Sequence, residues 1–305
     1  GFKERKTTQL EALRQLAGDG AGITFVRGID LDGEPVPASA LSAPDGRPGL
    51  LRTNESTGET QIDPGIDFVG HRALAPGSRL TWSGWITIPA DGEYELKVQT
   101  DWGVGPFLFN PGGHSTVYVD GREVASTAPF ESRTLSLIPT SSGLTTASGS
   151  VQLTSGRHEI RVAARLKSLF ARDPSLTTPY QLRLAWLTPE MRGATLDAAA
   201  AAARDAPTAI VFVHNEGAEG VDRSSLDLPL GQNELIAAVA AANPRTVVVL
   251  NTGDPVVMPW ADRANAILQM WYPGQEGGAA TADLLLGRAN PSGKLPVTFP
   301  RHDGD

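Results

Sequence analysis

The sequence predicts an α/β plus all-β chain, in which a mainly parallel α/β sandwich domain is interrupted by an antiparallel β-sandwich. Two observations predict this class. Towards the C-terminus, short apolar runs alternate with helical stretches, which indicates βαβ units and a mainly parallel sheet. The middle of the chain carries short runs of alternating apolar and polar residues separated by Asp-Gly turns, which is typical of antiparallel strands.

The N-terminal stretch predicts a helix followed by a strand. Leucines recur at helical spacing from Thr7 to Leu16, and a threonine at the start can cap the helix. A short apolar run, Ile23–Val26, is expected to form a strand before a turn-rich stretch. Residues 35–48 hold four prolines without periodicity, which predicts a linker.

The stretch from residue 49 to residue 190 predicts the antiparallel β-sandwich. Period-two alternation favours strands at Leu80–Ile86, Tyr94–Val98, Thr116–Val119, His158–Val162 and Gln181–Trp186. The Asp-Gly pairs at residues 91–92 and 120–121 supply turns between strands. The phrases IPADGEYELKV, STVYVDGREV and GRHEIRV resemble the PA14 module.

The C-terminal part predicts three buried strands, and helices lie before, between and after them. The strands are expected at Ala209–Val213, Thr246–Leu250 and Ala266–Trp271, and the helices at Leu196–Arg204, Gly231–Ala242 and Ala279–Leu286. In open α/β sheets, ligands bind beyond the carboxyl ends of the strands. The loop after Val213 is therefore the candidate site.

That loop carries two carboxylates, Glu216 and Glu219, and the neighbouring pair Asp222-Arg223. Glu219 lies between Ala218 and Gly220, whose small size lets a substrate approach. Short acidic motifs also arise by chance, so an ordinary loop of solvated acids stays open from the spacing alone.

Four motifs in order, EGVDRSSLDLP, ANPRTVVVLNTGDPVVMPW, MWYPGQEGG and NPSGKLPVTFP, resemble the second domain of family 3 glycoside hydrolases, which are mostly β-glucosidases. The resemblance implies part of a retaining enzyme that hydrolyses terminal β-D-glucosides, with Glu219 as general acid/base. Glu216 is the rival residue for that role, and it stays open as a solvated acid or one that tunes Glu219 by like charge.

Some members of that family carry a PA14 module inserted into the second domain, and the order of segments here matches that insertion. The implied division has three parts. Residues 1–48 are the first part of the α/β sandwich with a linker, residues 49–190 are the PA14-like insert, and residues 191–305 are the remainder with the acid/base loop.

The family's nucleophile is an Asp on a preceding (β/α)₈ barrel. Such a barrel needs about 250 residues and cannot fit here. The barrel of the same polypeptide is therefore the expected partner.

Further candidates for contact with a carbohydrate or a glucosylated small molecule lie outside the two glutamates. Trp102, Phe107 and Phe109 belong to a long Gly-rich loop whose aromatics suit sugar rings or aglycones, although a loop that merely covers the sandwich end is the alternative. Arg223 is a second candidate and is also expected to bind a carboxylate or a backbone carbonyl. Asp254 is expected as a surface or capping acid. Tyr272 is expected as a core aromatic, although the resemblance places its loop near the active face.

Composition and charge limit which partners, metals and cofactors the chain can be expected to bind. A formal net charge of −8 without a basic stripe argues against a nucleic-acid partner, and no apolar run approaches the roughly 18 residues of a membrane span. Cysteine is absent, and two scattered acids, Asp101 and Asp120, do not make a calcium site, so neither metal nor cofactor is expected. A non-catalytic carbohydrate-binding or adhesion module is the alternative function.

The start at Gly1 predicts a piece of a longer polypeptide. The compartment, which can be secreted, periplasmic or cytoplasmic, is left open, and so is the formation of a homodimer.

Overall fold

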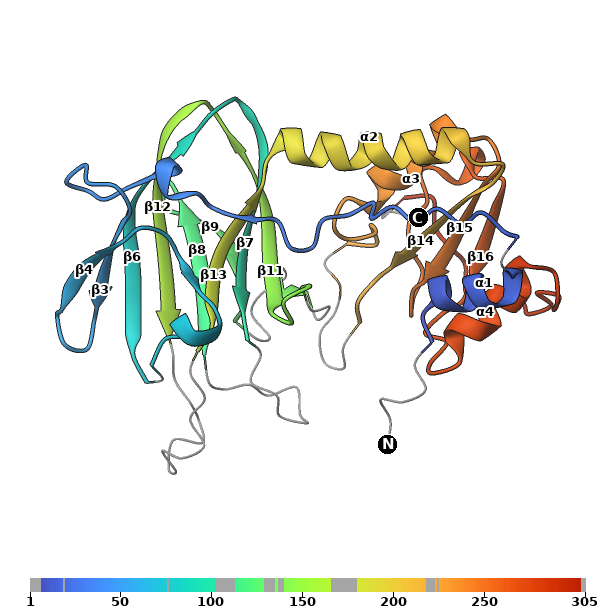
Figure 1. The fold of residues 1–305 in the computed structure, drawn as a ribbon, viewed down its shortest axis with the longest axis horizontal. Helices are drawn as coiled ribbons and strands as arrows, with labels where there is room; N and C mark the ends of the chain where they lie inside the picture. The colour runs from blue at the N-terminus through green and yellow to red at the C-terminus, as the bar shows by residue number, and fades with distance from the viewer. Residues whose placement is uncertain are drawn as a thin grey trace. The chain divides into compact units, whose positions relative to one another are not determined.

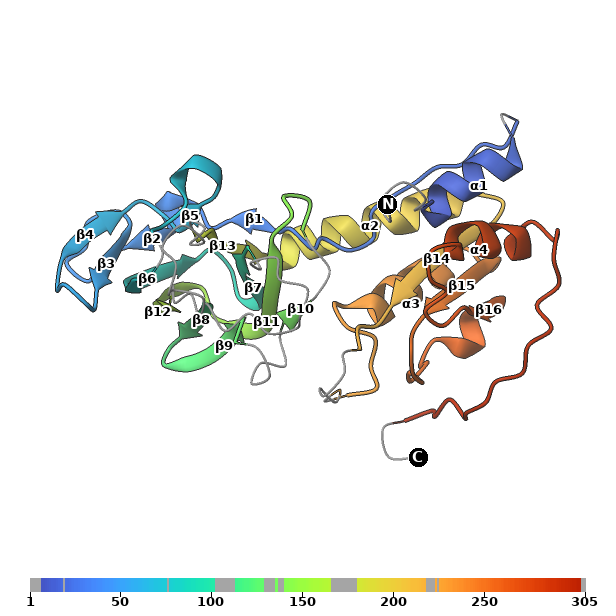
Figure 2. The ribbon, with the colours of Figure 1, turned by 90° about the horizontal axis from the view of Figure 1, so that it is seen from below.

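The computed structural model describes residues 7–18, 20–75, 77–101, 113–128, 135–136, 140–165, 180–217, 223 and 225–302. Its contacts divide the chain into two compact units (Figures 1 and 2). One combines Gly1–Ile29 with Gly193–Asp305, and the other is Asp30–Arg192. The first unit is therefore built from two separate stretches of chain, and the second is continuous.

The unit Asp30–Arg192 consists of two antiparallel sheets. Within the described residues, the first sheet has the order β1-β13-β7-β11-β10, with β5 also paired to β13. Its strands are β1 Glu34–Pro35, β5 Asp67–Phe68, β7 Gly92–Thr100, β10 Leu135–Ser136, β11 Thr145–Leu153 and β13 Leu182–Leu187. The second sheet has the order β4-β3-β6-β12-β8-β9, with β2 paired to β6. Its strands are β2 Leu41–Ser42, β3 Leu50–Asn54, β4 Thr60–Asp63, β6 Arg79–Ile88, β8 His114–Val119, β9 Arg122–Ser126 and β12 Gly156–Arg165.

The core of this unit lies where the apolar faces of the two sheets meet. Alternate residues of β6 are buried, and every residue of β7 from Tyr94 to Thr100 is buried. Trp82 and Tyr94 are among the largest buried side chains. Burying a large apolar side chain contributes about 1.5–3 kcal/mol, so the alternation seen in the sequence has an energetic basis. All five strands expected from alternation are present, as parts of β6, β7, β8, β12 and β13.

The stretch expected as a linker, residues 35–48, contains short paired elements. Pro35 of β1 pairs with Ala185 of β13, and β2 pairs with β6. Two 3-10 helices, η1 Ala38–Ala40 and η2 Gly70–Arg72, also belong to this unit.

The other unit contains a parallel sheet of the order β14-β15-β16 in its described part. The strands are β14 Ala209–His214, β15 Thr246–Asn251 and β16 Ala266–Gln269. The helices are α1 Gln9–Ala17, α3 Gln232–Ala242, α4 Gly277–Leu285 and the 3-10 helix η4 Ala261–Arg263. Helix α2, Pro189–Asp205, belongs to this unit from Gly193 onward. Residues of α2 and α3 pack with Val211 and Val213 in one core cluster. Phe212 packs with α1 and α4 in a second cluster, so the sheet is covered on both faces.

The N-terminal helix begins as its sequence predicts. Thr8 caps α1: its hydroxyl accepts a hydrogen bond from the backbone N–H of Glu11, at 3.2 Å. The Glu11 carboxylate accepts one from the backbone N–H of Thr8, at 2.8 Å. This reciprocal capping box satisfies two backbone donors that the helix leaves unpaired.

The expected strand Ile23–Val26 is wrong. This segment forms no strand, although Ile23 and Val26 each pack against a core cluster. Phe25 between them is 61% exposed. No strand in the described part of the chain pairs with the backbone of residues 23–26, so the apolar residues of this segment are accounted for by packing against the two clusters.

The expected strand Ala266–Trp271 also ends early, at Gln269, and Trp271 takes a left-handed φ of 56°. Among the described helices, none is long and apolar enough to span a membrane.

Candidate functional site

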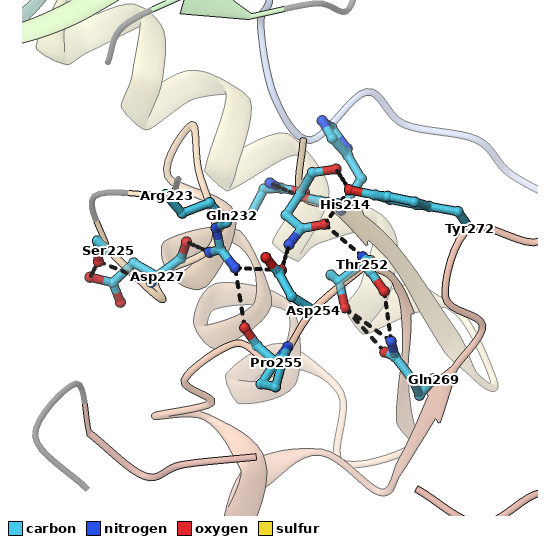
Figure 3. A network of polar contacts seen from close by, with 12 residues as sticks. His214, Arg223, Ser225, Asp227, Gln232, Thr252, Asp254, Pro255, Gln269 and Tyr272 are labelled. Atoms are coloured by element: carbon cyan, nitrogen blue, oxygen red, sulfur yellow. Dashed lines mark hydrogen bonds and ion pairs between the residues drawn. The ribbon is translucent and has the colours of Figure 1, made fainter. Parts of the chain in front are cut away.

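Three loops meet at the carboxyl edge of the parallel sheet. Because β14, β15 and β16 run in the same direction, the residues that follow each strand emerge at one edge. Asn215 and Glu216 follow β14, Thr252–Asp254 follow β15, and Tyr272 follows β16. Figure 3 shows the side chains of Thr252, Asp254 and Tyr272 gathered in one polar network.

Asp254 is the acceptor at the centre of this network. One of its carboxylate oxygens, Oδ1, accepts hydrogen bonds from Asn215 Nδ2 and from Arg223 Nη1, the latter at 2.7 Å. Asn215 precedes the segment 218–222 and Arg223 follows it directly. A single carboxylate therefore binds one residue on each side of segment 218–222 in the sequence.

Arg223 is held by further backbone acceptors. Its Nη1 donates to the carbonyl of Pro255 at 3.1 Å, and its Nη2 to the carbonyl of Asp227 at 2.7 Å. The side chain is only 15% exposed. The planar guanidinium therefore connects the residues after β15 to those that lead into α3, as expected for a fork of fixed donors.

Tyr272 reaches the same asparagine from the third loop. Its hydroxyl donates to Asn215 Oδ1 at 2.9 Å, and the backbone N–H of Gly253 donates to the same oxygen at 3.0 Å. A Cβ atom at Gly253 would lie 2.4 Å from the Tyr272 ring, so the ring rests directly on this glycine. Tyr272 is 53% exposed. The expectation that it is a core aromatic is wrong, because its hydroxyl and one ring face are held at the edge.

Two glutamines fix the ends of the strands beneath this network. Gln232, fully buried at the start of α3, accepts from the backbone N–H of His214 at 2.8 Å and donates to its carbonyl at 2.7 Å. Gln269 donates to the carbonyl of Thr252 at 2.8 Å. These bonds complete backbone pairing where β14 and β15 end, so the loops start from fixed positions.

Two buried polar atoms at this edge lack a partner in the described part of the chain. They are His214 Nε2 and Asn251 Oδ1, on residues that are aligned between β14 and β15. Burial lowers the pKa of His214, and the negative charge of Glu216 opposes that shift. His214 is consequently neutral at neutral pH, and its buried Nε2 has no protein partner among the described residues.

The residues expected at the site are only partly within the described chain. Glu216 lies beside His214, and Arg223 binds a carboxylate and backbone carbonyls as expected. Glu219, Trp102, Phe107 and Phe109 lie outside the described residues. Asp101 accepts from the backbone N–H of Gln181, at 2.8 Å.

Asp120 binds His158, at 2.7 Å. No group of three His, Asp or Glu that could hold a metal is found in the ranges that the structure describes.

Asn215 and Asp254 were not expected at the site, and Tyr272 was expected near it only through the resemblance. Their contacts join residues 31 to 57 positions apart, which single-sequence patterns do not encode. The available signal was positional: each follows the carboxyl end of a predicted strand of the same parallel sheet.

Comparison with known proteins gives a family for this arrangement. A family model described as "Glycosyl hydrolase family 3 C-terminal domain" matches residues 5–305. The sequence is 57% identical over 83 residues, 27% of this chain, to "Probable beta-glucosidase J" of Aspergillus fumigatus, and 51% identical over 102 residues, 32% of this chain, to "Beta-glucosidase" of Rhizobium radiobacter. These stretches make up 10% and 12% of those proteins.

A solved structure resembles the chain over nearly its whole length. The crystal structure of DesR, a beta-glucosidase from Streptomyces venezuelae in complex with D-glucose, matches 98% of this chain with a TM-score of 0.68 and 34% sequence identity. The match spans 32% of the DesR chain. The chain thus corresponds to about a third of that enzyme and to smaller shares of the curated relatives, and the match includes both compact units.

Proposed function

The chain belongs to glycosyl hydrolase family 3, as its C-terminal domain, and from this membership we propose that it supplies the acid/base half of a retaining β-glucosidase. The substrate is a terminal β-D-glucoside, either a carbohydrate or a glucosylated small molecule. The barrel of the complete polypeptide supplies the Asp nucleophile. The named relatives, all β-glucosidases, support the activity.

Breaking a glycosidic bond with retention requires two carboxyl groups. One protonates the departing oxygen while the other attacks the anomeric carbon, and the first then activates water to release the sugar. We assign the acid/base role to Glu219, which follows β14 in the sequence, because the phrase EGVDRSSLDLP resembles the motif of the family. The family's nucleophile lies in the barrel, so this chain holds one of the two groups.

The network centred on Asp254 is the observation that carries the proposal. It ties Asn215 and Arg223, on either side of segment 218–222, to one fixed carboxylate. A general acid must lie within hydrogen-bond reach of the leaving oxygen, and small displacements cost rate. An anchored loop stem is therefore what an acid/base residue at position 219 requires.

Other groups at this edge suit contact with the substrate. His214 Nε2 and Asn251 Oδ1 each lack a protein partner in the described residues and can bind sugar hydroxyls or groups of the barrel. We also propose that Arg223 acts on the substrate through the loop it holds, and that Trp102, Phe107 and Phe109 contact the aglycone.

The unit Asp30–Arg192 is proposed to be a PA14-like insert. Its two antiparallel sheets and the motifs of β7, β8 and β12 support this proposal.

Glu219→Gln in the complete enzyme tests the assignment. The substitution keeps the shape and removes the transferable proton, so hydrolysis of an alkyl β-glucoside should fall by about 10²–10⁴-fold. A nitrophenyl-type group leaves as a stable anion, so its glycosylation step should be affected less. The water-activating base is also lost, and added azide should restore turnover and yield a β-glycosyl azide.

Glu216→Gln is the matched control in the same loop. It should show neither the dependence on the leaving group nor rescue by azide. If Glu216→Gln shows both and Glu219→Gln shows neither, the roles of the two glutamates are exchanged. If neither variant shows them, the loop has no acid/base function.

A further inference from the structure

Four arginines gather on the outer face of the second sheet of the unit Asp30–Arg192. In that sheet β12 lies between β6 and β8 (Figure 1). The side chains of Ile160, Val162 and Ala164 in β12 are buried in the core, so the residues between them point outwards. The exposed arginines of β12, together with the arginine that the register places opposite its last residue in β6, form what we call the arginine face: Arg157, Arg161, Arg165 and Arg79.

Aromatic rings hold two of these arginines in place. The guanidinium of Arg157 lies 4.8 Å from the ring centroid of Trp85 in β6, and that of Arg161 lies 3.9 Å from the ring centroid of Tyr118 in β8. Arg157 Nη2 also donates to Ser42 Oγ at 3.5 Å. Contact with a ring restricts an arginine side chain without using its N–H donors. Both guanidiniums are thus positioned before a partner binds, which lowers the entropic cost of binding.

The arginine face lacks the acidic partners that other arginines of the unit have. Arg192 forms an ion pair with Glu93 at 2.6 Å, and Arg183 forms one with Asp67 at 2.9 Å. Among the described residues, by contrast, no carboxylate forms an ion pair with any arginine of the arginine face. Its positive charges are therefore available at the surface.

The alignment of Arg79 with Arg165 is unfavourable without an anion. Like charges directly opposite each other on neighbouring strands are destabilising. The register cannot slip to separate them, because their neighbours Leu80 and Ala164 are buried and a slip would turn these to the solvent. A carboxylate or phosphate that binds both guanidiniums removes the repulsion. This pair therefore favours an anionic partner.

The order of charges along β12 distinguishes between classes of anionic partner. Arg157, Arg161 and Arg165 recur every four residues, which corresponds to about 13 Å along a strand. Glu159 lies between the first two, and Glu123 of β9 adds a second carboxylate on the same side. The closely spaced phosphates of a nucleic acid or an anionic membrane would meet these carboxylates and the net charge of −8. Both classes are therefore disfavoured.

An extended polypeptide can match this order of charges. Side chains alternate between the two sides of an extended chain, so residues four apart lie on one side about 13 Å from each other. Acidic residues at that spacing can meet the three arginines of β12, while small residues between them avoid Glu159. Trp85 and Tyr118 add aromatic surface, and aromatic residues and arginine are enriched at protein interfaces. We propose that the arginine face binds an extended acidic segment of protein.

The test uses the full chain and a fluorescein-labelled peptide that carries Glu at every fourth position and Ser or Thr elsewhere. Fluorescence anisotropy should show saturable binding that weakens as salt is added, because exposed charges are screened. Arg157→Gln combined with Arg161→Gln should raise Kd about tenfold, the loss expected from two exposed ion pairs. Trp85→Leu removes the ring beside Arg157 but no charge, and should raise Kd about twofold to threefold.

Arg122→Gln is the matched control. Arg122 is exposed in the same unit, but its register partner is the buried Val119, so it lies outside the arginine face. Its removal changes the net charge equally to a single arginine substitution in β12 and should leave Kd unchanged.

The proposal is overturned if the folded parent does not bind the peptide, if the double variant binds it as tightly as the parent, or if Arg122→Gln weakens binding as much as the double variant does. Tighter, arginine-dependent binding of double-stranded DNA or of phosphatidylserine vesicles than of the peptide would also overturn it. So would a dimer of the parent, seen by sedimentation, that the double variant abolishes while the peptide does not bind. None of these measurements involves hydrolysis, so this proposal and the proposed function fail separately.

Discussion

At the scale of single residues, loss of the Asp254 carboxylate should disturb the proposed active site the most. Its Oδ1 accepts from both Asn215 and Arg223. Asn215 is 4% exposed, so it would lose its carboxylate partner in a place that water reaches poorly. A buried donor left without a partner costs about 1–3 kcal/mol, which is enough to release a loop stem.

Asp254→Ala in the complete enzyme should therefore lower kcat by about tenfold to a hundredfold, because the acid/base residue is no longer held in place. KM for a small aryl glucoside should change less. The measurement is steady-state kinetics with the pH profile of kcat, whose limb for the general acid should move. Asp262→Asn, an exposed acid in η4, serves as the control. An unchanged kcat and pH profile in folded Asp254→Ala would remove the positioning role.

His158 predicts how the stability of the sandwich unit depends on pH. A hydrogen bond to Asp120 raises the pKa of His158 above its ordinary value, while burial opposes the shift. The protonated histidine is favoured in the folded state, so this stabilisation is fully present below the unfolded pKa of about 6.5. It is lost as the pH rises through the folded pKa.

His158→Gln should abolish this dependence. The thermal midpoint of the parent should fall between pH 6 and pH 8 by more than that of the variant, an interval set by the ordinary histidine pKa of about 6.5. The difference should shrink at high salt, because the Asp120 side chain is 51% exposed and its charge is screened. Parallel pH curves for parent and variant would show that the pair contributes no linked stability.

Contacts between residues that are distant in the sequence could not be predicted from it. Arg223 was expected to bind a carboxylate or a carbonyl, because a guanidinium in a polar loop needs fixed acceptors. Which carboxylate it binds depends on the parallel pairing of β14 and β15, which brings residue 254 to the same edge. No local pattern specifies that contact.

At the scale of elements, the loops after β15 and β16 pack on each other through Gly253 and the ring of Tyr272. A Cβ atom on Gly253 would lie 2.4 Å from that ring, closer than any normal contact. The ring must then move, and its hydroxyl leaves Asn215. Gly253→Ala should therefore impair catalysis through geometry, although no group that touches the substrate is removed.

We expect Gly253→Ala to lower kcat of the complete enzyme several-fold, and Tyr272→Phe, which deletes the hydrogen bond to Asn215, to do so to a similar extent. Steady-state kinetics on an aryl glucoside measures both. Gly293→Ala is the control, because nothing lies within 4 Å of a Cβ atom there. Wild-type kinetics for both Gly253→Ala and Tyr272→Phe would show that the packing of these loops does not position the site.

Alternation in the sequence identified the strands that bury apolar side chains and overlooked those that do not. β6 and β7 carry regular apolar positions and were expected. β11 reads TTASGSVQL, with few apolar residues, yet it pairs with β7 over nine residues. Its place in the sheet is decided by that neighbour. Ile23–Val26 shows the opposite case, in which apolar residues pack against the core without a strand.

At the scale of the whole molecule, each compact unit has a separate cluster of buried residues. The switch from helical to period-two patterns and back made this organisation visible in the sequence. The detailed division into residues 1–48, 49–190 and 191–305, and the PA14-like nature of the insert, stay predictions. To test them, the two sheets of the insert would have to be superposed on those of a known PA14 module, and patterns in the sequence do not supply that comparison.

The chain also spans only about a third of the DesR β-glucosidase, 32% of its length, so the proposed function makes a prediction for the isolated 305-residue chain. It should not measurably hydrolyse an aryl β-glucoside, because retaining hydrolysis needs a nucleophile and an acid/base, and this chain is assigned only the second. The assay is release of the aryl alcohol by purified, folded chain, with the complete polypeptide as positive control. Turnover by the isolated chain that survives Glu219→Gln would come from a contaminant or from another site. Turnover that is lost in Glu219→Gln would mean that one of the chain's own carboxylates acts as the nucleophile, and the division of the two carboxyl groups between barrel and C-terminal domain would then be wrong.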